Sequence, residues 1–163
     1  MINSMKREKF DELYTPEEAV YPLLPYIPKG WRIWECTDLG NSNITKVFKE
    51  QGYDVISTHI NGGFDFLQDE PNFEFDVIIT NPPYSLKNQF LKRAYELEKP
   101  FAFLLPITTL EGKFRGWLFR KYGVEILVLD KRINFLRNKR NVWYHTSWFC
   151  WKILPEQLIF VAI

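Results

Sequence analysis

The sequence predicts an α/β protein with a mostly parallel sheet of about seven strands, helices on both faces and an antiparallel hairpin at the C-terminus. The main observation is that short apolar runs alternate with helix-like segments between residues 31 and 130. In residues 142–163, by contrast, two strand-like runs follow each other with no helix between them. The length of 163 residues suits a single domain, 1–163.

The predicted strands are short and rich in β-branched and aromatic residues. They cover residues 31–37, 53–60, 75–80, 101–106 and 124–130. Run 75–80 is nearly continuously apolar, which predicts burial on both faces. Runs 142–153 and 158–163 are expected to pair with each other, antiparallel, at one edge of the sheet.

The predicted helices carry recognisable start and stop signals. Thr15 stands three residues before a glutamate, a capping-box spacing, and Pro16 would occupy the first helical position. Prolines at 22 and 25 should break this first helix. Further helices are expected over 43–52, ended by Gly52, over 85–98 with Ser85 as N-cap, and over 110–123, ended by Gly123.

Composition and charge leave two readings of the surface open. The net charge is only +1 and aromatic residues make up 17% of the chain. Residues 51–86 contain no Lys or Arg, whereas basic residues dominate 113–140. The basic stretch is either a solvated face or an electrostatic footprint for nucleic acid.

The two cysteines, Cys36 and Cys150, are too few for a disulfide framework, and we read both as reduced core residues. No apolar signal region opens the chain, and no run reaches membrane-spanning length. We therefore expect a cytoplasmic protein without a membrane partner, and we predict no metal site.

Four loops are expected to meet where parallel strands end. They are residues 35–43, 59–65, 81–84 and 106–109. In open α/β sheets ligands bind beyond the carboxyl ends of the strands. The loop 81–84 reads Asn-Pro-Pro-Tyr directly after a buried strand, and neither proline can continue the hydrogen-bond ladder.

Asn81-Pro82-Pro83-Tyr84 resembles the catalytic motif of the amino-methyltransferases, and the chain looks most like the small phage-type N6-adenine methyltransferases. The resemblance runs from about Tyr14 to Trp151. It implies a Rossmann-like methyltransferase fold, S-adenosylmethionine as cofactor, and a nucleic acid as partner, with DNA favoured over RNA. It also implies that Asn81, Pro82, Pro83 and Tyr84 are the catalytic residues.

The chemistry of the motif can be argued from its residues. The amino lone pair of adenine is delocalised into the ring, so the nitrogen is a poor nucleophile. Hydrogen bonds accepted by the Asn81 side-chain oxygen and the Pro82 carbonyl would make it more tetrahedral and more nucleophilic. The prolines would hold these acceptors in place before the reaction, and Tyr84 would stack on a base flipped out of a duplex.

The resemblance assigns cofactor binding to residues in four segments: Thr15 and Pro16; Glu35, Gly40 and Ser42; His59; Asp65 and Phe66. It implies that Asp65 and Phe66 contact the adenine of the cofactor. The chain departs from the family pattern at three places. Cys36 replaces the usual proline, Ser42 replaces the second glycine of a loop that is one residue longer, and His59 replaces an acidic residue.

Other functions stay open at this point. The chain could be a methyltransferase-fold protein that has lost catalysis and binds or inhibits a partner, because its cofactor loops depart from the pattern. The motif also occurs in enzymes that methylate a glutamine amide or a guanine amino group. An interaction module with an aromatic tail is a further reading.

No separate target-recognition domain fits in the chain, so specificity is low or supplied by a protein partner. Phe135 and the pair 143–144 are candidates for the second side of a base sandwich, or for the core.

Overall fold

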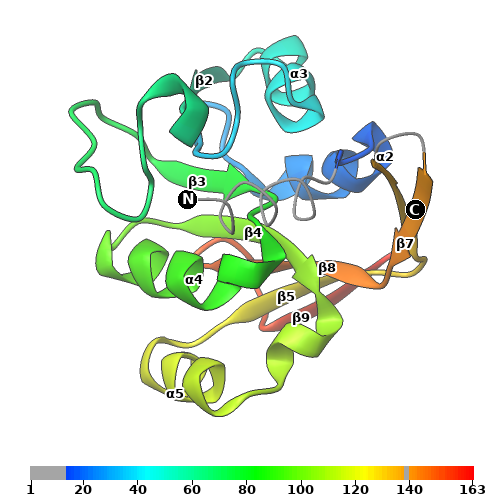
Figure 1. Ribbon diagram of the computed structural model, residues 1–163. Helices are drawn as coiled ribbons and strands as arrows, with labels where there is room; N and C mark the ends of the chain where they lie inside the picture. The colour runs from blue at the N-terminus through cyan, green and yellow to red at the C-terminus, as the bar shows by residue number, and fades with distance from the viewer. Residues whose placement is uncertain (1–13, 138–139) are drawn as a thin grey trace.

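The computed structural model describes residues 14–137 and 140–163 (Figure 1). A seven-stranded sheet with the order β2-β1-β3-β4-β8-β5-β9 forms the centre of the molecule. Its strands are β1 Arg32–Glu35, β2 Asp54–Ser57, β3 Val77–Thr80, β4 Phe101–Pro106, β5 Glu125–Leu129, β8 Thr146–Trp151 and β9 Leu158–Val161. Strands β2, β1, β3 and β4 are parallel neighbours. The predicted seven-stranded, mostly parallel sheet is confirmed.

The C-terminal strands are connected differently from our expectation. Segments 146–151 and 158–161 are strands, but they do not pair with each other. Strand β8 lies antiparallel between β4 and β5, and β9 is parallel to β5 at the edge. Strand β8 is buried along almost its whole length, so only an interior position can cover it on both faces.

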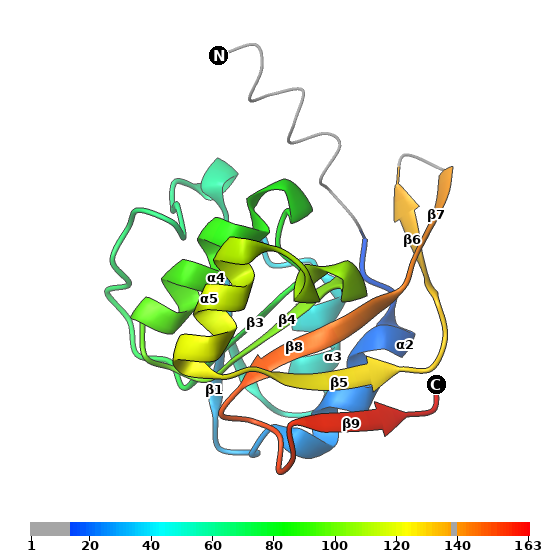
Figure 2. The same ribbon diagram turned by 90° about the horizontal axis from the view of Figure 1, so that it is seen from below.

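An antiparallel hairpin does exist, from β6 (Ile133–Arg137) and β7 (Arg140–Tyr144), and it forms a separate two-stranded sheet. It projects away from the main sheet in Figure 2.

Short helices connect the strands. The α-helices are α2 Glu17–Val20, α3 Asn43–Glu50, α4 Lys87–Glu96 and α5 Lys113–Tyr122. The 3₁₀-helices are η1 Tyr21–Tyr26, η2 Ile60–Gly62, η3 Tyr84–Leu86 and η4 Ile107–Leu110. As predicted, the chain leaves α3 through Gly52, whose φ of +88° suits a residue without Cβ. Helix α2 continues as the 3₁₀-helix η1, which contains the prolines at 22 and 25.

Two predicted helix caps are wrong. Helix α2 begins at Glu17 with Pro16 as N-cap and no side-chain cap, because the Thr15 hydroxyl is engaged with Asn81 instead. Ser85 lies within η3, and the N-cap of α4 is Leu86. The motif prolines are followed by a 3₁₀ turn, which delays the α-helix by two residues relative to the predicted start at 85.

Side chains alternate between two apolar cores, one on each face of the sheet. On one face Ile33, Leu104 and Trp148 pack against α2, η1 and α3. On the other, Trp34, Phe103 and Phe149 pack against α4 and α5. The ribbon agrees, with α2 and α3 on one side of the strands and α4 and α5 on the other (Figures 1 and 2). Helices on both faces are confirmed, and the period of two along each strand explains the arrangement.

Both cysteines are buried and unpaired, as predicted. Within the described ranges, none of the helices has the length and apolar character that a bilayer crossing needs.

Trp148 joins β8 to α2, so a change there should destabilise the fold. Its side chain is fully buried and its indole N–H donates to the Ala19 carbonyl at 2.8 Å. Trp148→Phe leaves a cavity and an unpaired carbonyl, and should lower the free energy of unfolding by about 2–4 kcal/mol in urea denaturation. Trp143→Phe is the matched control, since Trp143 is 56% exposed, and it should change stability by less than about 0.5 kcal/mol. Equal effects of the two changes would contradict this packing.

Candidate active site

The carboxyl ends of β1, β2, β3 and β4 lie along one edge of the sheet, because these strands are parallel neighbours. Backbone bonds join the loops after β1 and β2: Asp38 N–H donates to the Thr58 carbonyl, and Thr58 N–H donates to the Glu35 carbonyl. Side chains join the loops after β1 and β3, where the Thr80 hydroxyl donates to the Glu35 carboxyl group. Three of the four predicted loops are therefore bonded into one rim.

Asn81 begins the Pro-Pro loop and its side-chain amide is held at one end only. Its Nδ2 donates to Thr15 Oγ1 at 3.0 Å. Its Oδ1 is buried and has no hydrogen-bond partner among the described residues. A buried carbonyl oxygen without a donor is costly and uncommon. The amide is thus oriented with a free acceptor, as a site for an N–H ligand requires.

Thr15 connects the motif to the first loop. Besides accepting from Asn81, it accepts a bond from Asn43 Nδ2 at its carbonyl oxygen, at 2.9 Å. Asn43 is the first residue of α3, directly after the loop at 35–42. Pro16 follows as the N-cap of α2. The Thr15-Pro16 segment therefore lies between the two loops that the sequence assigned to acceptor and cofactor.

Among the described residues, further buried polar atoms without hydrogen-bond partners include four from segments at or near the same edge. These four are Tyr84 Oη, Thr109 Oγ1, Asn134 Oδ1 and Thr146 Oγ1. Tyr84 and Thr109 follow β3 and β4, Thr146 opens β8 opposite Pro106, and Asn134 lies in the hairpin after β5. Unpaired polar atoms from so many segments are typical of a site that binds a polar ligand.

Tyr84 packs with its ring against the root of the hairpin. Its ring centroid lies 5.6 Å from that of Tyr144, with the rings nearly perpendicular at 87°. Burial raises the pKa of the Tyr84 hydroxyl, so the group stays neutral. Among the candidates for a second side of a base sandwich, Phe135 is fully buried and belongs to the core, Trp143 is exposed, and Tyr144 alone contacts Tyr84.

Glu35 is a buried acid surrounded by hydroxyl groups. It is 2% exposed and accepts bonds from Thr37, Ser42 and Thr80. Burial raises its pKa to about 7; the bond from Thr80 opposes the shift and the nearby Asp38 carboxylate adds to it. Glu35 can therefore exist in either charge state near neutral pH.

Asp38 organises the same loop, and sequence reasoning missed it. Its carboxylate accepts from the Thr45 and Ser57 hydroxyls at 2.6 and 3.0 Å and from the backbone N–H groups of Asn41 and Ser42. Burial alone would raise the Asp38 pKa, but these bonds outweigh burial and lower it. The sequence did contain a signal for this role. An aspartate often accepts hydrogen bonds from backbone N–H groups a few residues later, and Asp38 stands three and four residues before Asn41 and Ser42, just ahead of α3.

The other two residues predicted in this loop have structural uses. Gly40 is exposed with φ of +103°, a conformation that favours glycine, as expected for a turn. Ser42 is the N-cap of α3, since its hydroxyl accepts from Thr45 N–H while donating to Glu35.

His59 follows β2 and caps the next turn. Its Nδ1 accepts from Asn61 N–H at 2.9 Å. In the neutral ring that accepts at Nδ1, the hydrogen is on Nε2, which is a donor. A ligand contact from His59 stays a prediction.

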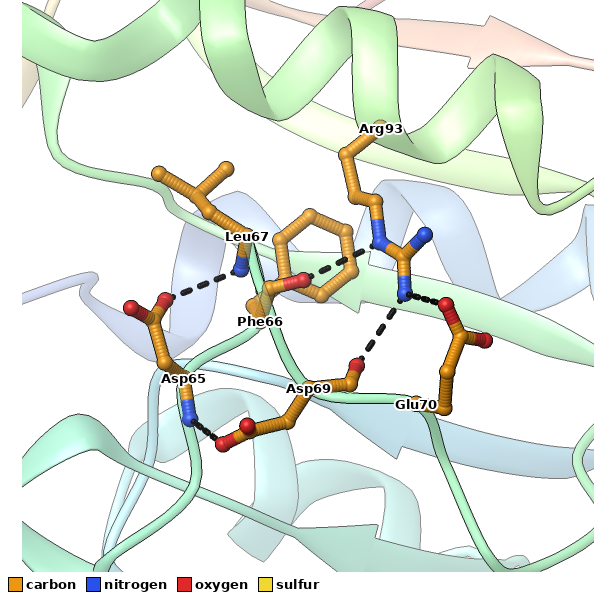
Figure 3. A network of polar contacts seen from close by, with 6 residues as sticks. All are labelled: Asp65, Phe66, Leu67, Asp69, Glu70 and Arg93. Atoms are coloured by element: carbon orange, nitrogen blue, oxygen red, sulfur yellow. Dashed lines mark hydrogen bonds and ion pairs between the residues drawn. The ribbon is translucent and has the colours of Figure 1, made fainter.

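The Asp65–Phe66 turn is braced from α4 by Arg93, which donates to the Phe66 and Asp69 carbonyls and to the Glu70 carboxylate (Figure 3). Asp65 Oδ1 accepts from Leu67 N–H, and its Oδ2 accepts no bond from the described residues.

Phe66 is 3% exposed. It stacks on Phe90, with ring centroids 4.9 Å apart, and meets the Trp34 ring nearly edge-on. Its packing is that of a core residue, so of this pair the Asp65 carboxylate is the group left open for a ligand.

No family model and no curated protein matches the sequence, but several solved structures have a similar fold. One similar structure is the methyltransferase subunit of a type I restriction-modification system from Streptococcus thermophilus. It has a TM-score of 0.60 and 17% identity over 93% of this chain and 47% of that one. A modification subunit assigned to a type I restriction enzyme from Vibrio vulnificus YJ016 has a TM-score of 0.56 and 13% identity, over 99% of this chain and 50% of that one.

A third similar structure is a Listeria monocytogenes protein assigned as a class I S-adenosylmethionine-dependent methyltransferase. It has a TM-score of 0.51 and 12% identity over 92% of this chain and 65% of that one. The chain therefore has the Rossmann-like fold of these methyltransferases, and it spans about half the length of the two restriction-system subunits.

The raised pKa of Glu35 makes stability depend on pH in a defined direction. A folded-state pKa of about 7, above the unfolded value of 4.5, gives a contribution that is full below pH 4.5 and is lost as pH rises through 7. Glu35→Gln has no such loss. The stability of the native protein relative to Glu35→Gln should therefore fall by about 2–3 kcal/mol between pH 5 and pH 8 in urea denaturation. A difference that does not change with pH would contradict a neutral buried Glu35.

Proposed function

We propose that this protein is an S-adenosylmethionine-dependent methyltransferase that methylates the N6 amino group of adenine in nucleic acid, with DNA as the acceptor rather than RNA. The observation that carries the proposal is the Asn81 amide, whose oxygen is buried, oriented through Thr15 and without a partner among the described residues. The fold shared with known methyltransferases supports the same reaction class.

The Asn-Pro-Pro-Tyr loop would act by positioning and by electrostatics. Asn81 Oδ1 and the Pro82 carbonyl would accept the two amino hydrogens and raise the electron density on the nitrogen. Both prolines restrict the loop, so these acceptors need no reorganisation during the reaction. S-adenosylmethionine, when bound, supplies a methyl group on a positively charged sulfur. Such a transfer depends on alignment more than on an acid or base.

The rim offers suitable groups for S-adenosylmethionine. Asp65 Oδ2 is an open acceptor that fits an amino group. His59 can donate to a hydroxyl from Nε2. Gly40 lets the backbone approach a ligand, and Glu35, Thr15 and Pro16 lie on the loops between that turn and Asn81. The donor and acceptor set therefore fits a nucleoside that carries an amino acid.

The charge distribution favours nucleic acid over protein as the acceptor. Basic residues dominate 113–140, a range that includes α5 and β5, and acidic residues dominate 51–86, a range that includes β2 and β3. A flipped adenine would stack on Tyr84. Sequence specificity would be low or would be supplied by a protein partner.

Asn81→Ala tests the catalytic role. It removes one of the two acceptors, so methyl transfer from labelled S-adenosylmethionine should fall by at least about 100-fold, while calorimetry should show unchanged cofactor binding. Transfer is measured with DNA, RNA and protein pools, which also identifies the acceptor. An active Asn81→Ala protein would refute the mechanism, and label appearing only in the protein pool would refute the nucleic-acid acceptor.

Thr15→Val tests whether Thr15 orients Asn81. The change keeps the volume but leaves Asn81 Nδ2 without its acceptor, so the amide can rotate. We expect kcat to fall by about 10-fold or more with little change in KM, and stability to fall by about 1–3 kcal/mol. Thr15→Ser retains Oγ and should restore kcat. If Thr15→Ser is as slow as Thr15→Val, the hydroxyl is not the positioning group.

A second candidate is a methyltransferase-fold protein that binds a partner without catalysis. Its support is that the Phe66 ring is covered on its faces and that His59 stands where an acidic residue is usual. Calorimetry with S-adenosylmethionine separates the two functions, since absence of binding at millimolar ligand would reject the enzyme and favour the binding protein.

A further inference from the structure

Helix α5 carries two aromatic rings on its solvent face. Trp117 is 45% exposed and Phe114 is 38% exposed, although both are large apolar side chains. Their ring centroids lie 6.1 Å apart with the planes tilted by 39°. Leu118, the residue after Trp117, is buried in the core. The packing of α5 on the sheet therefore does not use these two rings, and their exposure needs another explanation.

Basic side chains flank the two rings. Lys113, Arg120 and Lys121 are exposed on the same helix, and Lys121 Nζ lies 5.1 Å from the centroid of the Trp117 ring. No Asp or Glu occurs between 113 and 122. In the part of the chain that the structure describes, none of these three cations forms a salt bridge, whereas Lys46, Lys92, Arg93 and Lys131 each have a carboxylate partner.

The helix is also tied to the candidate active site. Arg115 donates to the Thr109 carbonyl in the loop after β4 and to Asn88 Oδ1 in the first turn of α4, both at 2.8 Å. Asn88 follows the Asn-Pro-Pro-Tyr loop by only four positions. Because Arg115 holds its first turn to these two segments, α5 begins close to the rim and runs away from it along the sheet (Figure 2).

We propose that the exposed face of α5, formed by Lys113, Phe114, Trp117, Arg120 and Lys121, binds single-stranded nucleic acid next to the target base. Unpaired bases present ring faces that stack on aromatic side chains, and the phosphates neutralise the cations. A duplex keeps its bases paired and offers only phosphates to this face. The choice of nucleic acid rests on the proposed function, but the binding face itself does not require catalysis.

Two variants test the face by fluorescence anisotropy with a labelled mixed-sequence single strand, DNA or RNA, and with the matched duplex. Trp117→Ala should weaken single-strand binding by about 5- to 100-fold, since one stacked base is lost. The double variant Lys113→Glu with Lys121→Glu should weaken it by about 10-fold or more. It should also reduce the slope of log affinity against log salt by about 1.4, from two fewer phosphate contacts.

The matched controls make the same kinds of change, two charge reversals or the loss of one exposed ring, at positions outside α5. Lys49→Glu with Lys99→Glu alters the net charge equally, at exposed positions on α3 and after α4. Tyr21→Ala removes a ring that is 45% exposed on η1. Both should bind the single strand as the native protein does. Equal weakening by variants and controls, or native-like binding by Trp117→Ala, would overturn the proposal, as would tighter binding of the duplex.

These experiments distinguish failure of the α5 binding face from failure of the proposed methyltransferase function. Binding that depends on α5, without methyl transfer by the native protein, would reject the enzyme and retain this face. Methyl transfer to nucleic acid at native rates by the α5 variants would reject the face and retain the enzyme.

Discussion

The hydrogen bond from the Thr80 hydroxyl to the buried Glu35 carboxyl group connects the ends of two adjacent parallel strands. The loops that follow β1 and β3 leave the sheet near this bond. The loop with Asp38 and Ser42 starts after β1, and Asn81 follows Thr80 directly. Because the two strand ends are bonded to each other, the acceptor loop and the cofactor loop begin from a common point.

The polar rim differs physically from the sheet behind it. Both faces of the sheet are covered by apolar side chains, which supply the burial that stabilises the domain. The rim instead contains a buried acid with a raised pKa and a buried amide oxygen that has no partner in the described part of the chain. Such groups cost stability, and they are characteristic of sites prepared for a ligand. Asp38 has the opposite role, since its carboxylate is fully engaged in holding the loop together.

Prediction from sequence succeeded for features that depend on residues close together in the chain. The alternation of strands and helices indicated the parallel sheet, and glycines marked the ends of α3 and α5. It failed where a side chain had two possible partners. Thr15 has capping-box spacing, but its hydroxyl instead accepts a hydrogen bond from Asn81, 66 residues away. The pairing of β8 was equally beyond local rules, since burial on both faces, and not proximity to β9, put it between β4 and β5.

The sequence by itself determined the class of fold, the buried strand β3 and the Asn-Pro-Pro-Tyr loop at its end, because period and proline content act within a few residues. The tertiary structure alone decided what each polar group of the site does. It assigned Ser42 to a helix cap and Phe66 to the core, and it left the Asn81 oxygen without a partner among residues 14–137 and 140–163. The reason is that a hydrogen bond or a ring contact needs a partner, and here many of the partners come from distant segments that only the folded sheet brings together.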